Sequence, residues 1–574
     1  MSQMHNPYAE ERDHSVYEIG HGVAWIFAIV FMGLLWVPGL WEHVHQTVKG
    51  KLADTPAGKM FHWTPGETLQ QHLHGVEKRM DESGYCVALR QGIQGWLVAN
   101  AGEGNRRSFI GYNDWLFYQP DIKALTGYGP LKPEPFSVMK DPELDKTRDP
   151  KDLIIEFAAQ LKERGVPLLL VPLPLKPMLY SEYITGESDY LWITHPDAVK
   201  FYDLLREHGV DVLDLTKDFA TLRQKRKHVF MRVPDKKDKE AIAKAEEEAK
   251  ELTEAFLKQD THWTPEAMRF AAEKVSAYIK QKYPDASTPG FRNIRAVDGA
   301  KRESLGDLVK LLDLKNPQDY FDKESAFLKI ISDNTNDKDS SLTLLGDSFL
   351  NIYDDPTLGF AYPAKPEERL RAGFAQTLSL LLRKPLDVIA LSGKGATGVR
   401  VSFAKKPDDE VRAKKLVVWV IASRDVLLSR GAARDANIEW ASVKFNPNRS
   451  DNSASVTPNP PDVNAPLVVE ATLVEKSKNQ DPGGTPYRDA LHTALYDVQK
   501  VVTGRLEAKQ VLGVQWTFKE KQMQPTASFA VGQRYRLTLV PWEAKKDLQT
   551  INRQEDVLAF DAPMMFVEKA EKAD

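Results

Sequence analysis

The sequence predicts an α/β protein with a mostly parallel sheet flanked by helices, an N-terminal transmembrane helix and a small C-terminal all-β domain. Between residues 111 and 430, apolar strand-like segments alternate with helical patterns, which is typical of a parallel sheet covered by helices. An uncharged apolar run lies near the N-terminus, at 23–41. After residue 467, strand-like segments continue without a strong helical pattern between them.

Composition and charge limit the classes of function. The chain has 574 residues, enough for two or three domains, and its apolar share of 42% is ordinary for a globular protein. The net charge of −4 gives no electrostatic reason to bind nucleic acid. Cys86 is the single cysteine, so no disulfide forms within the chain and cysteine usage does not identify the compartment. We expect its thiol to be buried rather than reactive.

The N-terminal region combines a polar tail, residues 1–22, with a run at 23–41 that has the length and apolarity of a transmembrane helix. Trp25, Trp36 and Trp41 lie near the ends of this run, where interfacial aromatic side chains are common. A cleaved signal peptide fits less well, because a basic start and a clean cleavage site are missing. A buried core helix is the other alternative.

The charges that flank this run give a weak signal of orientation. Arg12 precedes it, whereas Lys49, Lys51 and Lys59 follow it. The positive-inside rule would therefore place the bulk of the chain in the cytoplasm, but long domains obey that rule poorly.

Residues 42–110 predict a membrane-proximal helical link that contains two His-x-His pairs. Each pair could form half of a metal site, but no acidic or cysteine partner lies nearby at ligand spacing. We therefore expect surface histidines and no metal site in this link. The pairs are His43 with His45, and His72 with His74.

Five apolar segments are candidates for the strands of the parallel sheet. Helical patterns separate most of them, for example at 152–164 and 367–383. A charged run with alanines at helical spacing, 235–258, predicts a solvated helix. The predicted strands are 166–171, 210–215, 342–347, 386–391 and 416–421.

The segment 341–349 is the centre of the functional prediction. An apolar run of strand-forming residues ends abruptly there at Gly346-Asp347-Ser348. In α/β folds, functional residues lie at the carboxyl ends of parallel strands, and a glycine permits the sharp turn that exposes the hydroxyl. Because a serine hydroxyl is a weak nucleophile alone, Ser348 needs a base that a third group orients.

His262 and Asp260 are the best candidates for that base and its orienting group. Side chains two apart in an extended segment leave the same face, so Asp260 can hold the imidazole while its other nitrogen faces Ser348. Thr264 and Pro265 predict that a helix begins directly after them. Each motif alone is more simply explained as a turn or a helix cap. Together they favour a catalytic triad.

With these motifs the sequence resembles the alginate O-acetyltransferase AlgX/AlgJ-like family, which has an SGNH-hydrolase-like domain. The family carries an Asp-x-His-Trp block followed by a Gly-Asp-Ser block, and the resemblance covers roughly residues 110–430. After Trp419 the chain departs from the family, which usually has an acidic residue and a proline near Val420-Ile421-Ala422-Ser423-Arg424. Other matching segments are Trp115-Leu116-Phe117-Tyr118 with Pro120-Asp121, Val171-Pro172-Leu173-Pro174-Leu175-Lys176, and Lys415-Leu416-Val417-Val418-Trp419.

The resemblance implies an O-acetyltransferase domain, residues 111–430, that acts on an extracytoplasmic polysaccharide. It implies a single-pass inner-membrane protein with a periplasmic catalytic domain, and a multi-span membrane acyltransferase that supplies the acetyl group. Ser348 would carry the acetyl group, His262 would act as base, Asp260 would orient His262, and no cofactor is needed. A carbohydrate acetylesterase with the same triad and a non-catalytic polysaccharide-binding scaffold are the alternatives.

The segment 393–398 matches the pattern Gly-x-Gly-x-x-Gly after a predicted strand. A dinucleotide-binding fingerprint opens a helix and is followed by an acidic residue about 20 positions on. Residues 399–403 look poor for a helix start, and the next strand ends near 421 without an acid. We therefore predict no nucleotide cofactor, and a loop near Ser348 that can lend an amide to an oxyanion hole.

The C-terminal part predicts a linker, 431–466, and a small β domain, 467–574. The linker is rich in Asn, Pro and Ser from residue 445 onward. The spacing of the strands after it fits a five-stranded barrel. Trp516, Tyr535 and Trp542 could stack on sugars, but we favour core positions for them. The predicted strands are 467–474, 491–502, 510–518 and 534–541.

Overall fold

The computed structural model describes most of the chain from Ser83 onward, with longer gaps at 133–147, 232–237, 362–369 and 446–466 and several shorter ones. Before Ser83 it describes only scattered residues. The chain divides into two units, residues 1–96 and residues 97–574.

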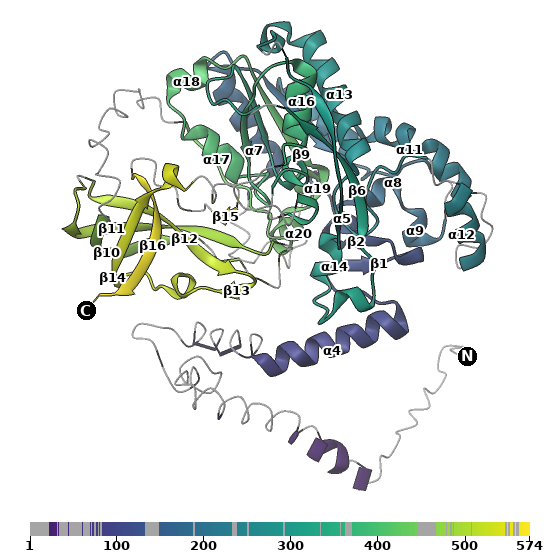
Figure 1. Ribbon diagram of the computed structural model, residues 1–574, viewed down its shortest axis with the longest axis horizontal. Helices are drawn as coiled ribbons and strands as arrows, with labels where there is room; N and C mark the ends of the chain where they lie inside the picture. The colour runs from purple at the N-terminus through teal and green to yellow at the C-terminus, as the bar shows by residue number, and fades with distance from the viewer. Residues whose placement is uncertain are drawn as a thin grey trace, which may run out of the picture. The chain divides into compact units, whose positions relative to one another are not determined.

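A five-stranded parallel sheet forms the centre of the α/β domain (Figure 1). The strand order is β4-β3-β9-β7-β8, and every pairing in it is parallel. The strands β3, β7 and β9 are buried along their whole length, as is typical of a sheet covered on both faces. Their bounds are Leu168–Leu173 (β3), Asp211–Val212 (β4), Leu342–Gly346 (β7), Asp387–Ala390 (β8) and Leu416–Ala422 (β9).

The five predicted strands are therefore confirmed, although 210–215 is reduced to the two residues of β4. Two short antiparallel pairs accompany the sheet, β1 with β2 and β5 with β6. Their bounds are Ser108–Ile110 (β1), Leu116–Tyr118 (β2), Ala296–Ser304 (β5) and Glu324–Ile331 (β6).

Helices surround the parallel sheet (Figure 1). The long helix α13 begins at Pro265, and its cap Thr264 accepts a hydrogen bond from the amide of Ala267, as the sequence predicts. These helices are α5 (Gln119–Thr126), α7 (Pro150–Lys162), α8 (Lys176–Leu179), α9 (Glu182–Thr185), α10 (Ala198–Glu207), α11 (Thr216–Met231), α12 (Lys239–Glu248), α13 (Pro265–Lys282), α14 (Asp307–Leu311), α15 (Ser348–Asn351), α16 (Phe374–Leu382), α17 (Gly398–Ala404), α18 (Asp408–Arg412), α19 (Ser423–Leu427) and α20 (Arg430–Asp435). A further helix, α4 (Gly84–Ala101), lies mostly within the unit 1–96.

Two predicted helices are shorter than expected. The charged run 235–258 contains only α12 among its described residues, and the chain from Leu252 to Trp263 is irregular. In this segment, backbone amides are hydrogen-bonded to a side chain instead of to helical carbonyls, since the Glu324 carboxylate accepts hydrogen bonds from the amides of Lys258 and Gln259. The prediction 367–383 begins too early, because α16 starts only at Phe374.

The segment after the glycine-rich loop is a helix, so the prediction of a poor helix start at 399–403 is wrong. In α17 the side chains of Val399, Val401 and Phe403 are fully buried. Arg400 is also buried, between the rings of Trp419 and Phe157 among others. Tertiary packing therefore overrides the low helix propensity of the β-branched residues.

Part of the predicted linker 431–466 packs against the α/β domain. The helix α20 is followed by Trp440, Val443 and Phe445, which belong to the main hydrophobic core. The carbonyl of Val443 accepts a hydrogen bond from Gln160 of α7. Residues 446–466 lie outside the described part of the chain.

The C-terminal domain is a β-barrel, as predicted. Its sheet order is β13-β12-β16-β14-β10-β11-β15, and an additional pairing joins β12 to β11. This pairing closes β10, β11, β12, β14 and β16 into a five-stranded ring. The bounds are Leu467–Lys476 (β10), Ala490–Thr503 (β11), Gln510–Lys519 (β12), Gln522–Met523 (β13), Arg534–Pro541 (β14), Asn552–Gln554 (β15) and Met564–Lys572 (β16).

Two of the three aromatic side chains singled out in the barrel are buried in its core. Tyr535 is buried and stacks on Phe529 with ring centroids 3.9 Å apart. Trp542 is buried in a second cluster, and Trp516 is half-buried beside it. The core interpretation of these aromatic residues is therefore the better one for Tyr535 and Trp542.

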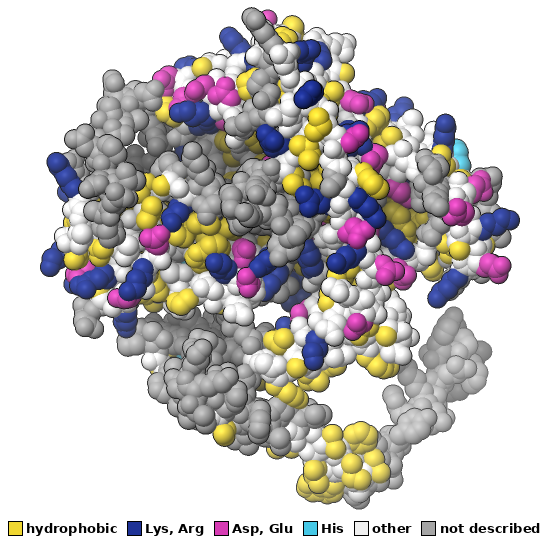
Figure 2. Space-filling model, in the orientation of Figure 1, with side chains coloured by type: hydrophobic (Ala, Val, Ile, Leu, Met, Phe, Trp, Pro, Cys, Tyr) yellow, Lys and Arg dark blue, Asp and Glu magenta, His cyan; other side chains and the backbone are white. Residues whose placement is uncertain are grey.

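Among the described residues, no helix combines the length and the apolarity needed to cross a membrane. The predicted span 23–41 is described only in part, and residues 34–41 lie outside the described ones. The described residues between Gly22 and Gly33 are helical, with exposed large apolar side chains (Figure 2). These side chains are Val23, Trp25, Ile26, Phe27, Ile29, Val30 and Met32.

Two smaller expectations for the N-terminal region are wrong. His72 is buried, not at the surface, because its ring stacks on Trp63 at 4.0 Å and its Nε2 lies 3.1 Å from the carbonyl of Met60. Cys86 is half-buried rather than fully buried. The other predicted surface histidines, His43, His45 and His74, lie outside the described residues.

Candidate active site

Ser348 is the first residue of α15 and follows directly on the carboxyl end of β7. Asp347 caps this short helix, because its carboxylate accepts a hydrogen bond from the amide of Phe349 at 3.0 Å. The turn needs Gly346, since a Cβ there would lie 2.6 Å from the side chain of Leu350 and 3.1 Å from the carbonyl of Val420. The sequence therefore places the hydroxyl at the predicted position, at the end of a buried strand.

The structure brings Ser348, His262 and Asp260 together in one hydrogen-bonded line. Nε2 of His262 lies 2.8 Å from Oγ of Ser348, and Nδ1 of His262 lies 2.6 Å from Oδ1 of Asp260. The same Oδ1 accepts a hydrogen bond from the backbone amide of His262 at 3.0 Å. All three side chains are buried. This geometry matches a nucleophile, a base and an orienting carboxylate.

A buried lysine supports the loop that carries Asp260 and His262. The ammonium group of Lys176 donates hydrogen bonds to the carbonyls of Leu116 at 2.6 Å, Lys258 at 2.7 Å and Asp260 at 3.1 Å. Burial lowers the pKa of Lys176 to about 8, although neighbouring carboxylates such as Glu324 act in the opposite direction. Lys176 therefore links β2, through Leu116, to the segment that carries Asp260 and His262.

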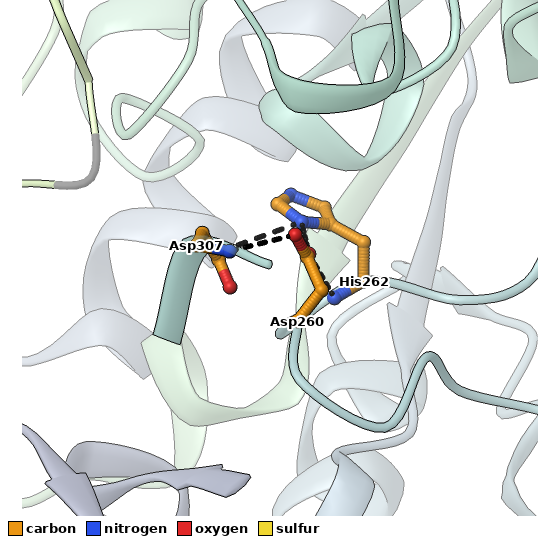
Figure 3. A group of neighbouring side chains, drawn as sticks. All are labelled: Asp260, His262 and Asp307. Carbon is orange, nitrogen blue, oxygen red and sulfur yellow. Dashed lines mark hydrogen bonds and ion pairs between the residues drawn. The ribbon is translucent and has the colours of Figure 1, made fainter. Parts of the chain in front are cut away.

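A second carboxylate, Asp307, stands beside the imidazole, and sequence analysis missed it (Figure 3). Its Oδ2 lies 3.6 Å from Nδ1 of His262, and its backbone amide donates to Oδ2 of Asp260 at 2.9 Å. Its carboxylate accepts hydrogen bonds from the amide of Thr261 at 2.7 Å and from the Thr261 hydroxyl. No local sequence motif predicts the position of Asp307. It lies beside His262 because Gly306 packs closely against the carbonyl of Gln259, which is distant in sequence.

The two carboxylates beside His262 have pKa values that are shifted in opposite directions. Burial alone would raise the pKa of Asp260, but the adjacent His262 outweighs it and the pKa falls to about 2. Burial and the charge of Asp260 raise the pKa of Asp307 to about 6. Burial alone would lower the pKa of His262, but Asp260 and then Asp307 outweigh it and the pKa rises. The imidazole of His262 is therefore more basic than that of an ordinary histidine.

The same three side chains offer ligand atoms within 4.8 Å of one another. However, Nδ1 of His262 and Oδ1 of Asp260 already share a direct hydrogen bond at 2.6 Å, which leaves no space for an ion between those two atoms. The donor set fits an oriented imidazole better than a metal centre.

One buried arginine, Arg424, lies near Asp347 and forms ion pairs with two carboxylates. It joins two segments that the sequence singles out. The guanidinium of Arg424 lies 2.9 Å from the carboxylate of Asp121 and 3.5 Å from that of Asp425. Burial raises the pKa of Asp425 to about 7, against the effect of Arg424. Asp347 adds to the negative charge around this group. The chain thus places a buried cation where it departs from the expected family pattern.

The glycine-rich loop lies beside the serine turn, as predicted. A Cβ on Gly395 would lie 3.1 Å from Oδ2 of Asp347, and the carbonyl of Gly395 accepts a hydrogen bond from Trp419 at 2.8 Å. Gly393 has a φ of 72°, which favours glycine. The loop is therefore fixed against the segment that holds Ser348.

The model of the SGNH hydrolase-like domain of the acetyltransferase AlgX matches residues 109–236 and 235–423. The chain belongs to this AlgX family. Curated relatives include the probable alginate O-acetylase AlgJ of Pseudomonas aeruginosa, which is 24% identical over 333 residues, 56% of this chain and 71% of the relative. The protein of the same name from Azotobacter vinelandii is 24% identical over 334 residues, 56% of this chain and 70% of that one.

Two solved structures of this group are also similar to the chain, at low overall similarity. The O-acetyltransferase domain of Pseudomonas putida AlgJ is 18% identical, covers 56% of this chain and 91% of that chain, and has a TM-score of 0.37. Pseudomonas aeruginosa AlgX is 14% identical, covers 65% and 78%, and has a TM-score of 0.36. The triad and Asp307 all lie within the residues that match the AlgX family, whereas the β-barrel lies outside them.

Proposed function

We propose that this AlgX-family protein is an O-acetyltransferase that moves acetyl groups to hydroxyls of an extracytoplasmic polysaccharide through an acetyl-serine intermediate. The observation that carries the proposal is the unbroken hydrogen-bonded line from Asp260 through His262 to Ser348, with distances of 2.6 and 2.8 Å. A structural turn does not require a buried carboxylate, imidazole and hydroxyl in this order. The relatives named as alginate O-acetylases favour acetyl as the group and a polysaccharide as the acceptor.

In the first half-reaction, Oγ of Ser348 attacks the acetyl carbonyl carbon while its proton moves to Nε2 of His262. The donor's leaving group departs with that proton, and the acetyl group stays on Ser348. The negatively charged carbonyl oxygen of the intermediate would accept a hydrogen bond from the Ser348 backbone amide. Asp260 holds Nδ1 of His262 and stabilises the imidazolium that forms.

In the second half-reaction, a sugar hydroxyl gives its proton to Nε2 of His262 and attacks the acetyl-serine carbonyl. The bond from the carbonyl carbon to Oγ breaks, and Ser348 recovers its proton from His262. The products are the sugar O-acetyl ester and the free enzyme. Water in place of the sugar would give acetate, which is the acetylesterase alternative.

An assay that follows both acceptors in one reaction tests the proposal. The protein is incubated with an activated acetyl ester and an oligosaccharide, and both acetylated sugar and free acetate are measured. Acetylated sugar above the uncatalysed level supports the transferase. Acetate alone would establish the esterase instead. If neither product forms, the protein would be a polysaccharide-binding scaffold without catalytic activity.

We further propose that the enzyme is a single-pass inner-membrane protein with its catalytic domain outside the cytoplasm. The uncharged run at 23–41 and the exposed apolar side chains of the described helical residues between 22 and 33 favour a membrane anchor. A polysaccharide acceptor outside the cytoplasm then calls for acetyl groups delivered across the membrane. We propose a multi-span membrane acyltransferase as the partner that delivers them.

A further inference from the structure

The segment between β10 and β11 brings a side chain of the β-barrel to the catalytic serine. The side chain of Ser348 lies near enough to the phenol hydroxyl of Tyr487 to act on the pKa of that hydroxyl. The phenol ring lies against the glycine-rich loop, since a Cβ on Gly393 would lie 3.2 Å from Cε2 and 3.4 Å from the hydroxyl of Tyr487. The ring also packs against the main core of the α/β domain. Both domains belong to the unit 97–574.

The barrel itself fixes the segment that carries Tyr487. The amide of Lys521 donates a hydrogen bond to the carbonyl of Arg488 at 2.9 Å, and the amide of Glu520 donates to the carboxylate of Asp489 at 2.6 Å. The side chains of Arg488 and Glu520 also form an ion pair at 2.5 Å. Glu520 and Lys521 form the turn between β12 and β13, with φ of 51° and 64°. The position of Tyr487 is therefore set by the barrel strands.

The phenol has the protonation state of a hydrogen-bond donor. Burial raises the pKa of Tyr487, the Ser348 side chain acts in the opposite direction, and the carboxylates of Asp347 and Asp307 raise the pKa further. A neutral phenol does not compete with His262 as a base, and its hydroxyl can donate to Oγ of Ser348. The proton of Ser348 then remains available for Nε2 of His262, which lies 2.8 Å away.

We propose that Tyr487, supplied by the β-barrel domain, is a catalytic residue of the acetyl-transfer site. Its hydroxyl donates a hydrogen bond to the reacting oxygen of Ser348, and its ring shields the acetyl-serine from water. No proton passes from Tyr487 in either half-reaction, because His262 accepts and returns it. The donated hydrogen bond stabilises negative charge on Oγ when Ser348 leaves the acetyl carbon. The inference rests on the proposed function.

Two substitutions separate the hydroxyl from the ring. Tyr487→Phe keeps the ring and removes the hydroxyl, whereas Tyr487→Ala removes both. Tyr496→Phe is the matched control, because Tyr496 is buried in the same barrel and its hydroxyl donates to Gln515 at 2.8 Å. The full chain is acetylated with 4-nitrophenyl acetate. Intact mass then gives the rate at which acetyl-enzyme forms and its lifetime in water without an acceptor.

We expect Tyr487→Phe to slow the formation of acetyl-enzyme about tenfold, the loss of one hydrogen bond to the reacting oxygen, and to lengthen its lifetime in water, because the same hydrogen bond assists Ser348 as it leaves. Tyr487→Ala should show the same slower formation and a lifetime several-fold shorter than that of Tyr487→Phe, because water then reaches the acetyl-serine. The split between formation rate and lifetime is a readout that general destabilisation of the barrel does not produce. Tyr496→Phe should form acetyl-enzyme at the wild-type rate.

Wild-type rates and lifetimes in both Tyr487 variants would overturn the inference and leave the proposed function standing. An equal slowing in Tyr496→Phe would also overturn it, because the effect would then belong to barrel stability. A wild-type protein that never acquires an acetyl group would overturn the proposed function, and the role of Tyr487 with it.

Discussion

His262 lies between two buried carboxylates that act on it differently. Asp260 accepts the direct hydrogen bond from Nδ1 and thereby selects the tautomer whose unprotonated Nε2 faces Ser348. Asp307 stands at 3.6 Å and is held by Thr261, so its main effect on the imidazole is electrostatic. The first carboxylate orients the base and the second tunes its pKa.

The pH dependence of acetylation should report this tuning. His262 must be neutral to act as a base, so the rate should rise as pH passes the raised pKa of His262. Asp307→Asn removes a negative charge that favours the imidazolium, so the pKa of His262 should fall and the acidic limb of the profile should move to lower pH. The profile is measured as the rate of acetyl-enzyme formation from pH 5 to pH 9.

Asp203→Asn is the control for this profile, because Asp203 is exposed on α10 and pairs with Arg206. Its acidic limb should coincide with that of the wild type. A limb that does not move in Asp307→Asn, or that moves to higher pH, would show that Asp307 does not raise the pKa of the catalytic base.

Local motifs made Asp260, His262 and Ser348 predictable, because short spacing and turn chemistry fix their side-chain directions. Asp307 was not predictable in this way. It reaches the imidazole only because α14 begins against the loop of Asp260, a contact between segments 47 residues apart. Such a contact depends on tertiary packing that no local pattern encodes.

At the scale of elements, the irregular segment before α13 is the part that builds the site. It is fastened by Lys176 from α8, by Glu324 from β6 and by the start of α14. The sequence predicted a helix through most of this segment because its composition is helix-forming. The side-chain contacts replace that helical ladder, and the strands of the sheet, which are buried apolar runs, were predicted far better.

Gly306→Ala should separate α14 from this segment. A Cβ at this position would lie 1.9 Å from the carbonyl oxygen of Gln259 and 2.8 Å from the amide nitrogen of Asp260, and backbone atoms cannot yield as a flexible side chain can. Overpacking of this kind costs about 1–3 kcal/mol. We expect a lower melting temperature and a loss of acetylation of at least tenfold, measured by thermal unfolding and by mass.

Gly92→Ala is the matched control, because a Cβ there meets nothing within 4 Å. Alanine is also a better helix former than glycine, and Gly92 lies inside α4. Gly92→Ala should therefore keep full activity and an unchanged or higher melting temperature. Full activity in Gly306→Ala would contradict the role given to the contact between α14 and the Asp260 segment.

At the scale of the whole molecule, the chain joins an AlgX-family α/β domain to a five-stranded barrel. The barrel was predictable as a fold, since its strands alternate and no strong helix interrupts them. The contact of Tyr487 with Ser348 was not, because Tyr487 lies in an irregular segment between two strands. The barrel therefore reaches the candidate site through a residue that its own strand pattern does not mark.

The proposed membrane anchor can be tested on the full chain and a truncated one. Removing residues 1–45 deletes the uncharged run at 23–41, so we expect a protein that remains in the supernatant after a carbonate wash of membranes. The full chain should stay with the membranes. A truncated protein that still sediments with washed membranes would refute the single-span anchor.

The most direct test of the account is the chemical identity of the acetylated residue. The full chain is incubated with an activated acetyl ester, and peptide mass spectrometry locates the added acetyl group. We predict one acetyl group on the Ser348 peptide, no label in Ser348→Ala and a much slower label in His262→Ala. A label on another residue, or wild-type transfer activity in Ser348→Ala, would contradict the serine mechanism.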